Sequence, residues 1–227
     1  MLVAVKTGNI TYALMRKILM TRIEGSGHLG RLLVLITLFG LHATILASND
    51  TVNTSAGYPT DDELRMLPPY CKARLRGVSE TEKNQWLSRL GRQNWTGLHH
   101  YCAGLNLAKR ATLSTNPKAR NADLLKSYGI IKSYATDETT EDFILKHEVY
   151  YNLGKVALRL DNAGAGVTAL NKSIQIKPQF IPAYTALSDY YKSIGDKGEA
   201  ELILQRGLKI KPDSKSLNRR LAELKGK

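Results

Sequence analysis

Four residues whose types could bind a metal or react lie between positions 71 and 102. The stretch "GLHHYCAGLNLAKRA" (Gly97–Ala111) holds His99, His100 and Cys102, and Cys71 is the only other cysteine in the chain. Imidazole nitrogens and thiolates are ligands of zinc and copper. Cys71, His99 and Cys102 could therefore form a metal site, or the same stretch could simply be one helix of a larger fold.

The spacing of the two histidines does not favour a metal site. Adjacent residues on a helix point about 100° apart, so His99 and His100 cannot easily chelate one ion. His99 and Cys102 could share a helix face. The sequence contains no CxxCH, Gly-rich phosphate loop, G-x-S-x-G or H-E-x-x-H motif. We therefore expect no cofactor and no catalytic residue, and we expect the histidines to pack and form hydrogen bonds.

The first 47 residues have the layout of an export signal. Basic residues up to Arg31 precede the apolar run "LLVLITLFGLHATILA" (Leu32–Ala47), which ends in small residues. This run is shorter than the ~20 residues that a spanning helix requires. We expect a cleaved signal peptide and a periplasmic protein, with an uncleaved inner-membrane anchor as the alternative.

Export bears on the two cysteines. In an exported chain an even cysteine count favours a disulfide, here Cys71–Cys102. The alternative is a small periplasmic metal-binding or redox protein that uses Cys71, His99, His100 and Cys102.

The chain is basic, but its charges are spread out. The net charge is +13, and the residues before position 48 hold five basic residues and one acid, which leaves 28 − 19 = +9 for the remainder. A basic surface attracts nucleic acid, anionic lipid or acidic proteins. Since no run of five or more like charges occurs, we expect a solvated basic surface and no nucleic-acid site. Membrane contact is expected only if the N-terminal segment remains uncleaved.

The C-terminal part repeats itself with a period of 34 residues. The phrases "IQIKP" and "LKIKP" end at Pro178 and Pro212, and both registers place a small residue, Gly154 or Ser188, at the eighth position. The pattern resembles the tetratricopeptide repeat (TPR), in which two antiparallel helices form each unit. The resemblance implies an all-α fold, a short right-handed solenoid of antiparallel helix pairs with a capping helix at its C-terminal end.

The segments ahead of the two repeats can be assigned relative to them. The residues around Gly104 resemble Tyr150–Leu160 and predict an enlarged first unit, whose second helix covers about Lys118–Tyr134. Pro68 and Pro69 predict a non-helical arm ahead of it, stapled by the disulfide. A short helix from about Ser79 to Leu90 should follow. The expected segments are 1–47 (signal peptide or anchor), 48–66 (flexible polar linker), 67–96 (pre-repeat arm), 97–146 (divergent first helical repeat), 147–180 and 181–214 (TPRs) and 215–227 (capping helix).

Two phrases ahead of the repeats indicate a narrower family. "LPPYCKAR" (Leu67–Arg74) and "HHYCAGLNLAKRA" (His99–Ala111), with Trp86 between them, resemble exported TPR proteins of Gram-negative bacteria. The resemblance covers roughly residues 64–227 and implies repeat-mediated binding without an established reaction. It implies a non-catalytic interaction or scaffold module of the cell envelope. Its partner would be a protein or peptide, with an envelope assembly complex as one alternative.

The first helix of each TPR usually lines a concave face. Around Tyr151 this face carries mostly cationic and amide side chains, which resembles the clamp by which some TPR proteins hold an acidic peptide or its terminal carboxylate. A solvated face is the alternative. The expected groove residues are Tyr151, Asn152, Lys155, Arg159, Asp189, Lys192 and Arg219.

The export signal can be tested by removing it. We expect a chain without residues 1–47 to stay in the cytoplasm, because the apolar run that directs export is gone. Cell fractionation and immunoblotting of both chains measure this. Recovery of the shortened chain from the periplasm would contradict the signal.

Overall fold

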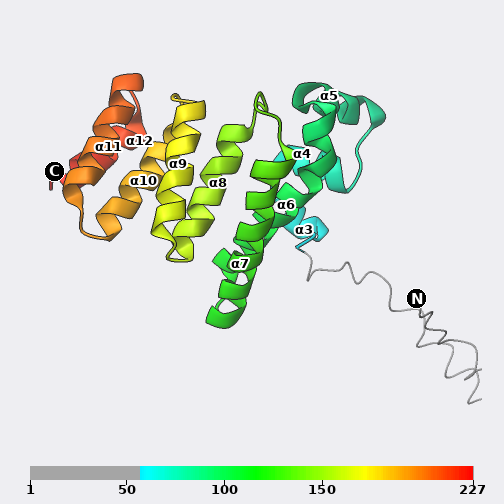
Figure 1. The fold of residues 1–227 in the computed structure, drawn as a ribbon, viewed down its shortest axis with the longest axis horizontal. Coiled ribbons are helices and arrows are strands. Elements are labelled where there is room, and N and C mark those ends of the chain that lie inside the picture. Colours follow the sequence, from blue (N-terminus) through cyan, green and yellow to red (C-terminus); the bar gives the residue numbers. More distant parts are fainter. Residues whose placement is uncertain (1–56, 227) are drawn as a thin grey trace, which may run out of the picture. The chain divides into compact units, whose positions relative to one another are not determined.

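The structure is a computed structural model that describes residues 57–226. Within this range the chain is helical and has no strand, which confirms the all-α fold class. Three antiparallel helix pairs stack side by side in chain order, followed by a last helix (Figure 1). The pairs are α6 (Arg92–Leu113) with α7 (Pro117–Ser133), α8 (Lys146–Arg159) with α9 (Ala163–Ile176), and α10 (Ile181–Ser193) with α11 (Lys197–Ile210); the last helix is α12 (Lys215–Leu224).

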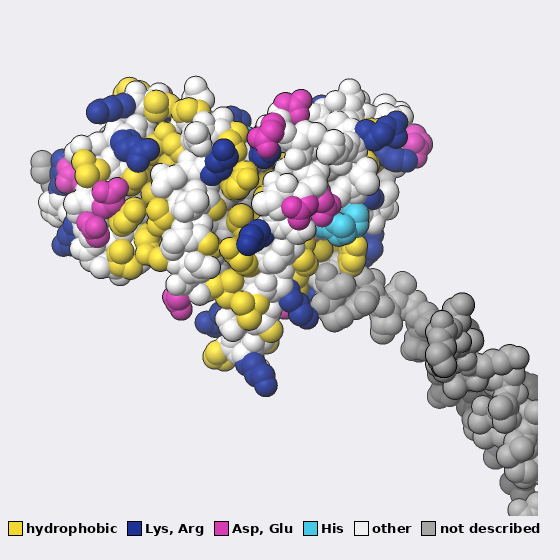
Figure 2. Space-filling model, viewed as in Figure 1, with side chains coloured by type: hydrophobic (Ala, Val, Ile, Leu, Met, Phe, Trp, Pro, Cys, Tyr) yellow, Lys and Arg dark blue, Asp and Glu magenta, His cyan; other side chains and the backbone are white. Residues whose placement is uncertain are grey.

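The expected signal or anchor at Leu32–Ala47 lies outside the described residues. Among residues 57–226, no helix is both long and apolar enough to cross a bilayer. Lys and Arg side chains are scattered over the face shown in Figure 2, with Asp and Glu among them.

Local sequence sets the ends of the repeated helices. The Asn162 and Asp196 side chains accept hydrogen bonds from backbone N–H groups three residues further on, at 3.2 and 2.9 Å. Such N-caps satisfy N–H groups that have no partner inside the helix. α9 and α11 end two residues before Pro178 and Pro212 respectively, because a proline and the residue before it are unfavourable in a continuing helix.

Glycines allow the paired helices to touch. A Cβ atom added to Gly154 of α8 would lie 2.7 Å from Leu170 Cγ of α9. One added to Gly104 of α6 would lie 2.7 Å from Ile131 Cγ1 of α7. Both distances are well below the 3.5–4.0 Å at which carbon atoms pack. The α6–α7 pair therefore uses the same close contact as the α8–α9 pair.

The segment ahead of the first pair begins with a helix, so the expectation of a non-helical arm at Pro68 and Pro69 was wrong. α4 (Pro69–Leu75) has Pro69 as its first residue. At that position the missing N–H is one that would have no intrahelical partner, and the fixed φ suits the helix. α5 (Glu80–Leu90) follows, with Ser79 as its N-cap, close to the expected bounds.

The end of the expected flexible linker, 48–66, is folded against α6. The short helix α3 (Asp61–Leu64) starts with a capping box between Thr60 and Glu63, and Leu64 is buried. Glu63 forms an ion pair with Arg110 of α6. The hydrogen bond from Arg110 lowers the pKa of Glu63 to about 2. A long-range ion pair therefore orders residues that look like a polar linker in sequence.

The first helical unit also differs from its expected bounds. α6 begins at Arg92 and not at Gly97, because α5 ends at Leu90 and the next residue, Gly91, has a φ of 79° that is incompatible with a continuing helix. α7 ends one residue before the expected Tyr134, and Tyr134–Glu138 forms a π-helical segment.

The apolar core has two parts. The first core is formed mainly by the pre-repeat helices with α6, α7 and α8, and the second by α9, α10, α11 and α12. Leu217 of α12 is fully buried in the second core, while Lys215 and Asn218 on the same helix are exposed. A helix with one polar face closes an array in this way.

The close contact at Gly154 gives a stability prediction. We expect Gly154→Leu to lower the free energy of unfolding by about 1–3 kcal/mol or more, because the new side chain collides with Leu170. Gly129→Leu is the matched control, since a Cβ atom added at Gly129 of α7 meets nothing within 4 Å. Thermal unfolding measured by circular dichroism compares the two variants. Equal melting temperatures would contradict the packing at Gly154.

Candidate functional site

A hollow of about 460 Å³ lies against α8. α8 forms one side of it, and the second half of α6 forms another. The segment Met66–Pro68 closes a third side from outside the helix pairs, and Phe180 and Pro182, at the start of α10, complete the lining. The lining residues from α6 and α8 are Leu105, Ala108, Lys109, Thr112, Glu148, Tyr151, Asn152, Lys155, Val156 and Arg159.

Part of this lining is aromatic and part is cationic. The Phe180 and Tyr151 rings meet edge to face, with their centroids 5.3 Å apart. The Lys155 ammonium lies 5.1 Å from the centroid of the Tyr151 ring, a cation–π distance. Arg159 Nη1 donates to the carbonyl oxygen of Ala108 at 3.0 Å and so connects α8 with α6.

The positive charges at the hollow have no acidic partner among the described residues. Lys109, Lys155 and Arg159 form no ion pair there. Burial lowers the pKa of Arg159, and the nearby Arg120 lowers it further. The hollow therefore combines an apolar surface with uncompensated positive charge.

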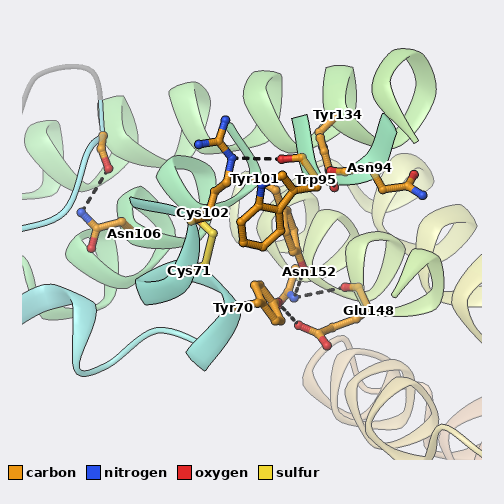
Figure 3. Close-up of a disulfide and its surroundings, with 12 residues drawn as sticks. Tyr70, Cys71, Asn94, Trp95, Tyr101, Cys102, Asn106, Tyr134, Glu148 and Asn152 are labelled. Atoms are coloured by element: carbon orange, nitrogen blue, oxygen red, sulfur yellow. Dashed lines mark hydrogen bonds between the residues drawn. A yellow bond between two sulfur atoms is a disulfide. The ribbon is translucent and has the colours of Figure 1, made fainter. Parts of the chain in front are cut away.

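A disulfide, drawn in Figure 3, lies three residues after Pro68 of the hollow's third side. Cys71, on the first turn of α4, is bonded to Cys102 of α6, which confirms the expected pairing. The tyrosines that precede the two cysteines, Tyr70 and Tyr101, stack with centroids 6.4 Å apart. Both cysteines are fully buried.

The same two tyrosines are hydrogen-bonded to residues that line the hollow (Figure 3). The Tyr70 hydroxyl donates to Glu148 Oε1 at 2.6 Å, and Asn152 Nδ2 donates to the Tyr101 hydroxyl at 2.8 Å. Burial raises the pKa of Glu148, and it also raises the pKa of Tyr70. Glu148 and Asn152 thus have structural partners, and Glu148 accepts its bond from a neutral hydroxyl group.

Comparison with protein families identifies the second and third helix pairs. Residues 147–180 and 181–214 each match the family described as Tetratricopeptide repeat. Residues 147–214 are two TPRs. Their bounds coincide with the registers set by Pro178 and Pro212. TPRs generally mediate protein–protein interaction, which is consistent with a scaffold role, and TPR proteins are typically non-catalytic. A search of curated proteins found none that matches the chain.

The first TPR supplies four of the seven expected groove residues to the hollow: Tyr151, Asn152, Lys155 and Arg159. The structure does not bring the other three, Asp189, Lys192 and Arg219, to it.

These three residues form ion pairs with α12 or within it. Arg220 donates to both carboxylate oxygens of Asp189, at 2.8 and 2.9 Å. Glu223 lies 3.9 Å from Lys192 and 3.7 Å from Arg219. Asp189, Lys192 and Arg219 therefore already have partners of opposite charge within the chain.

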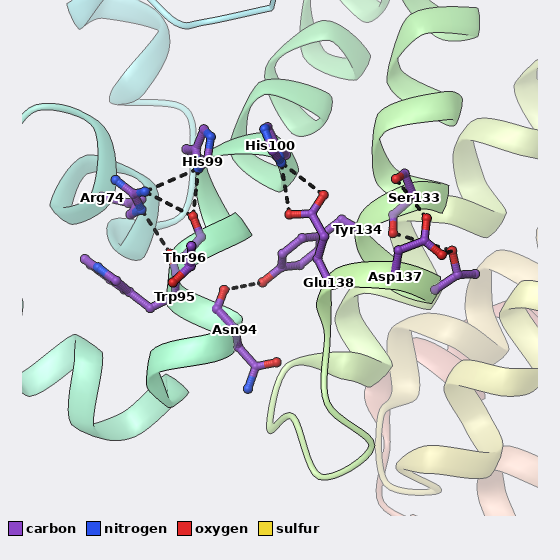
Figure 4. Close-up of polar contacts among 11 residues, drawn as sticks. Arg74, Asn94, Trp95, Thr96, His99, His100, Ser133, Tyr134, Asp137 and Glu138 are labelled. Atoms are coloured by element: carbon purple, nitrogen blue, oxygen red, sulfur yellow. Dashed lines mark hydrogen bonds and ion pairs between the residues drawn. The ribbon is translucent and has the colours of Figure 1, made fainter.

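The histidines do not converge on a shared ion (Figure 4). His99 donates from Nδ1 to the Thr96 carbonyl oxygen at 2.9 Å, and His100 donates from Nδ1 to Glu138 at 2.9 Å. Burial lowers the pKa of His99, and His100 adds to this effect. In the alternative metal set of Cys71, His99 and Cys102, both sulfur atoms are bonded to each other. Across residues 57–226, no three His, Cys, Asp or Glu side chains are grouped to hold a metal ion.

Sequence reasoning missed the lining residues that lie outside the two TPRs, namely Met66, Leu67, Pro68, Leu105, Ala108, Lys109 and Thr112. The 34-residue register gives no information about Met66–Pro68, and the resemblance of the residues around Gly104 to Tyr150–Leu160 was not extended to groove positions on α6. Phe180 was also missed, because it precedes α10 and falls outside the usual groove positions. The one available signal was the phrase "LPPYC", which places two prolines and a leucine just ahead of a cysteine.

The disulfide gives a second stability prediction. We expect the double variant Cys71→Ser, Cys102→Ser to lose about 3–4 kcal/mol of unfolding free energy, because the bond closes a loop of 31 residues. Urea unfolding measures this loss, and the wild-type protein kept in dithiothreitol should show a similar midpoint. A double variant that unfolds at the midpoint of the oxidised wild type would show that the bond adds no stability.

Proposed function

We propose that this protein is a non-catalytic scaffold of the bacterial cell envelope, exported to the periplasm, that binds a segment of a partner protein on the concave face of its first TPR. The observation that carries the proposal is the hollow of about 460 Å³ between the first TPR and the disulfide-held segment Met66–Pro68. Interaction through a face lined by first helices is the usual mode of repeat solenoids.

The composition of the hollow supports a protein ligand. Leu67 and Phe180 offer apolar surface, and burial of apolar surface drives association between proteins. Its volume is within the range of about 300–1,000 Å³ that is usual for ligand pockets, which is enough space for a few side chains of a bound segment.

Two observations support export. The apolar run Leu32–Ala47 follows basic residues, as in a secretory signal. The Cys71–Cys102 disulfide is of a kind that persists in oxidising compartments such as the periplasm.

Site-specific photo-crosslinking tests the binding surface. With p-benzoylphenylalanine in place of Tyr151 in the full chain, we expect a discrete crosslinked partner, which mass spectrometry then identifies. The control places the same group at Thr168 of α9, which is exposed and does not line the hollow. A crosslink pattern that is identical at the two positions, or no crosslink at Tyr151, would contradict the proposal.

A further inference from the structure

The hollow has two chemically different ends. Its apolar part contains Leu67 and Phe180, which come from two different segments of the chain. Its cationic part contains Lys109, Lys155 and Arg159. A ligand that fills the hollow must satisfy both parts at once.

We propose that this hollow recognises an acidic segment of the partner protein, in which a bulky apolar side chain lies close to a carboxylate. This inference rests on the proposed function and specifies the chemistry of its ligand. The apolar side chain would occupy the space between Leu67 and Phe180, and the carboxylate would pair with Lys155 and Arg159.

The apolar half is formed by surfaces that the fold leaves partly uncovered. Leu67, Pro68 and Phe180 are half-buried, and Met66 is 45% exposed. A second side chain placed between the two walls would cover both of them, as the ring of Phe180 already covers part of Tyr151. Large apolar or aromatic side chains provide the most contact area for such a site.

The cationic half calls for a carboxylate. Lys155 and Arg159 are four residues apart on α8 and so lie on the same face of that helix. Both are exposed, and neither has an acidic partner in the described part of the chain. A carboxylate can accept charge-assisted hydrogen bonds from a guanidinium and an ammonium group together.

A contrast within the chain supports this assignment. On the second TPR, Lys192 already lies near Glu223, and Arg220 is paired with Asp189. The fold therefore compensates the cations next to α12 and leaves those of the hollow for a ligand.

Glu148 gives the bound segment a direction. It lines the hollow eleven residues before Arg159, or about 16 Å along the axis of α8. Its carboxyl group, bonded to Tyr70, would repel a second carboxylate. We therefore expect the ligand carboxylate at the Arg159 end of α8 and the apolar side chain nearer Glu148.

Fluorescence polarisation with labelled peptides tests the ligand chemistry on the full chain. The probe is fluorescein-Gly-Ser-Asp-Glu-Phe-Leu-Asp-Gly. One comparison peptide replaces Phe and Leu by Ser, and the other replaces the three acids by Asn and Gln. We expect each comparison peptide to bind about tenfold more weakly than the probe or worse, because each lacks one of the two features.

Charge reversal at the hollow provides the matched control. We expect Lys155→Glu with Arg159→Glu to weaken probe binding by about tenfold or more, whereas Lys197→Glu with Lys211→Glu should change it by less than about twofold. Both double variants change the net charge equally, and Lys197 and Lys211 are exposed residues outside the hollow. Thermal unfolding checks that each variant is folded, and Lys155→Glu alone replaces the first pair if it is not.

Three results would overturn the inference: no binding of the probe, equal binding of all three peptides, or equal losses in the two double variants. If the probe fails while the crosslink at Tyr151 persists, the proposed ligand chemistry is wrong and the binding surface stands. If the crosslink at Tyr151 is also absent, both proposals fail.

Discussion

The bond between Cys71 and Cys102 determines where the chain ahead of the repeats lies. It joins α4 to α6 and so brings the residues beside the two cysteines into contact. Tyr70 stacks on Tyr101, and its hydroxyl group donates a hydrogen bond to Glu148 of the first TPR. The residues just before Tyr70 then form a wall of the hollow. The disulfide thus holds the segment ahead of the repeats beside the surface proposed for binding.

This arrangement shows how the phrases "LPPYC" and "HHYC" act together in this chain. Each places a tyrosine directly before a cysteine, so a bond between the cysteines also brings the tyrosine rings together. The rings bury apolar area, and their hydroxyl groups meet Glu148 and Asn152. Each phrase supplies one cysteine of the disulfide and one ring of the stacked tyrosine pair. The histidines of the second phrase form hydrogen bonds with nearby groups: His99 with the Thr96 carbonyl oxygen and His100 with Glu138.

Local patterns predicted most of the fold and four of the fifteen residues that line the candidate site. The helix pairs follow from periodicity, caps and small residues such as Gly154, all of which act over a few residues. Contacts between distant segments left no such pattern. The ion pair of Glu63 with Arg110 orders a segment that is polar in sequence. Glu223 of α12 forms an ion pair with Lys192, an expected groove residue on α10. The wall at Leu67 lies outside any repeat register.

The hollow extends across the junction between the two cores. Leu67 packs against the first core and Phe180 against the second. In repeat arrays each unit is stabilised mainly by its neighbours, and separate regions can open with different free energies. A segment bound between Leu67 and Phe180 would contact both cores. Unfolding of either core would then break these contacts. Occupancy of the hollow would then make unfolding of the array more cooperative and slow amide hydrogen exchange in helices that the ligand never touches.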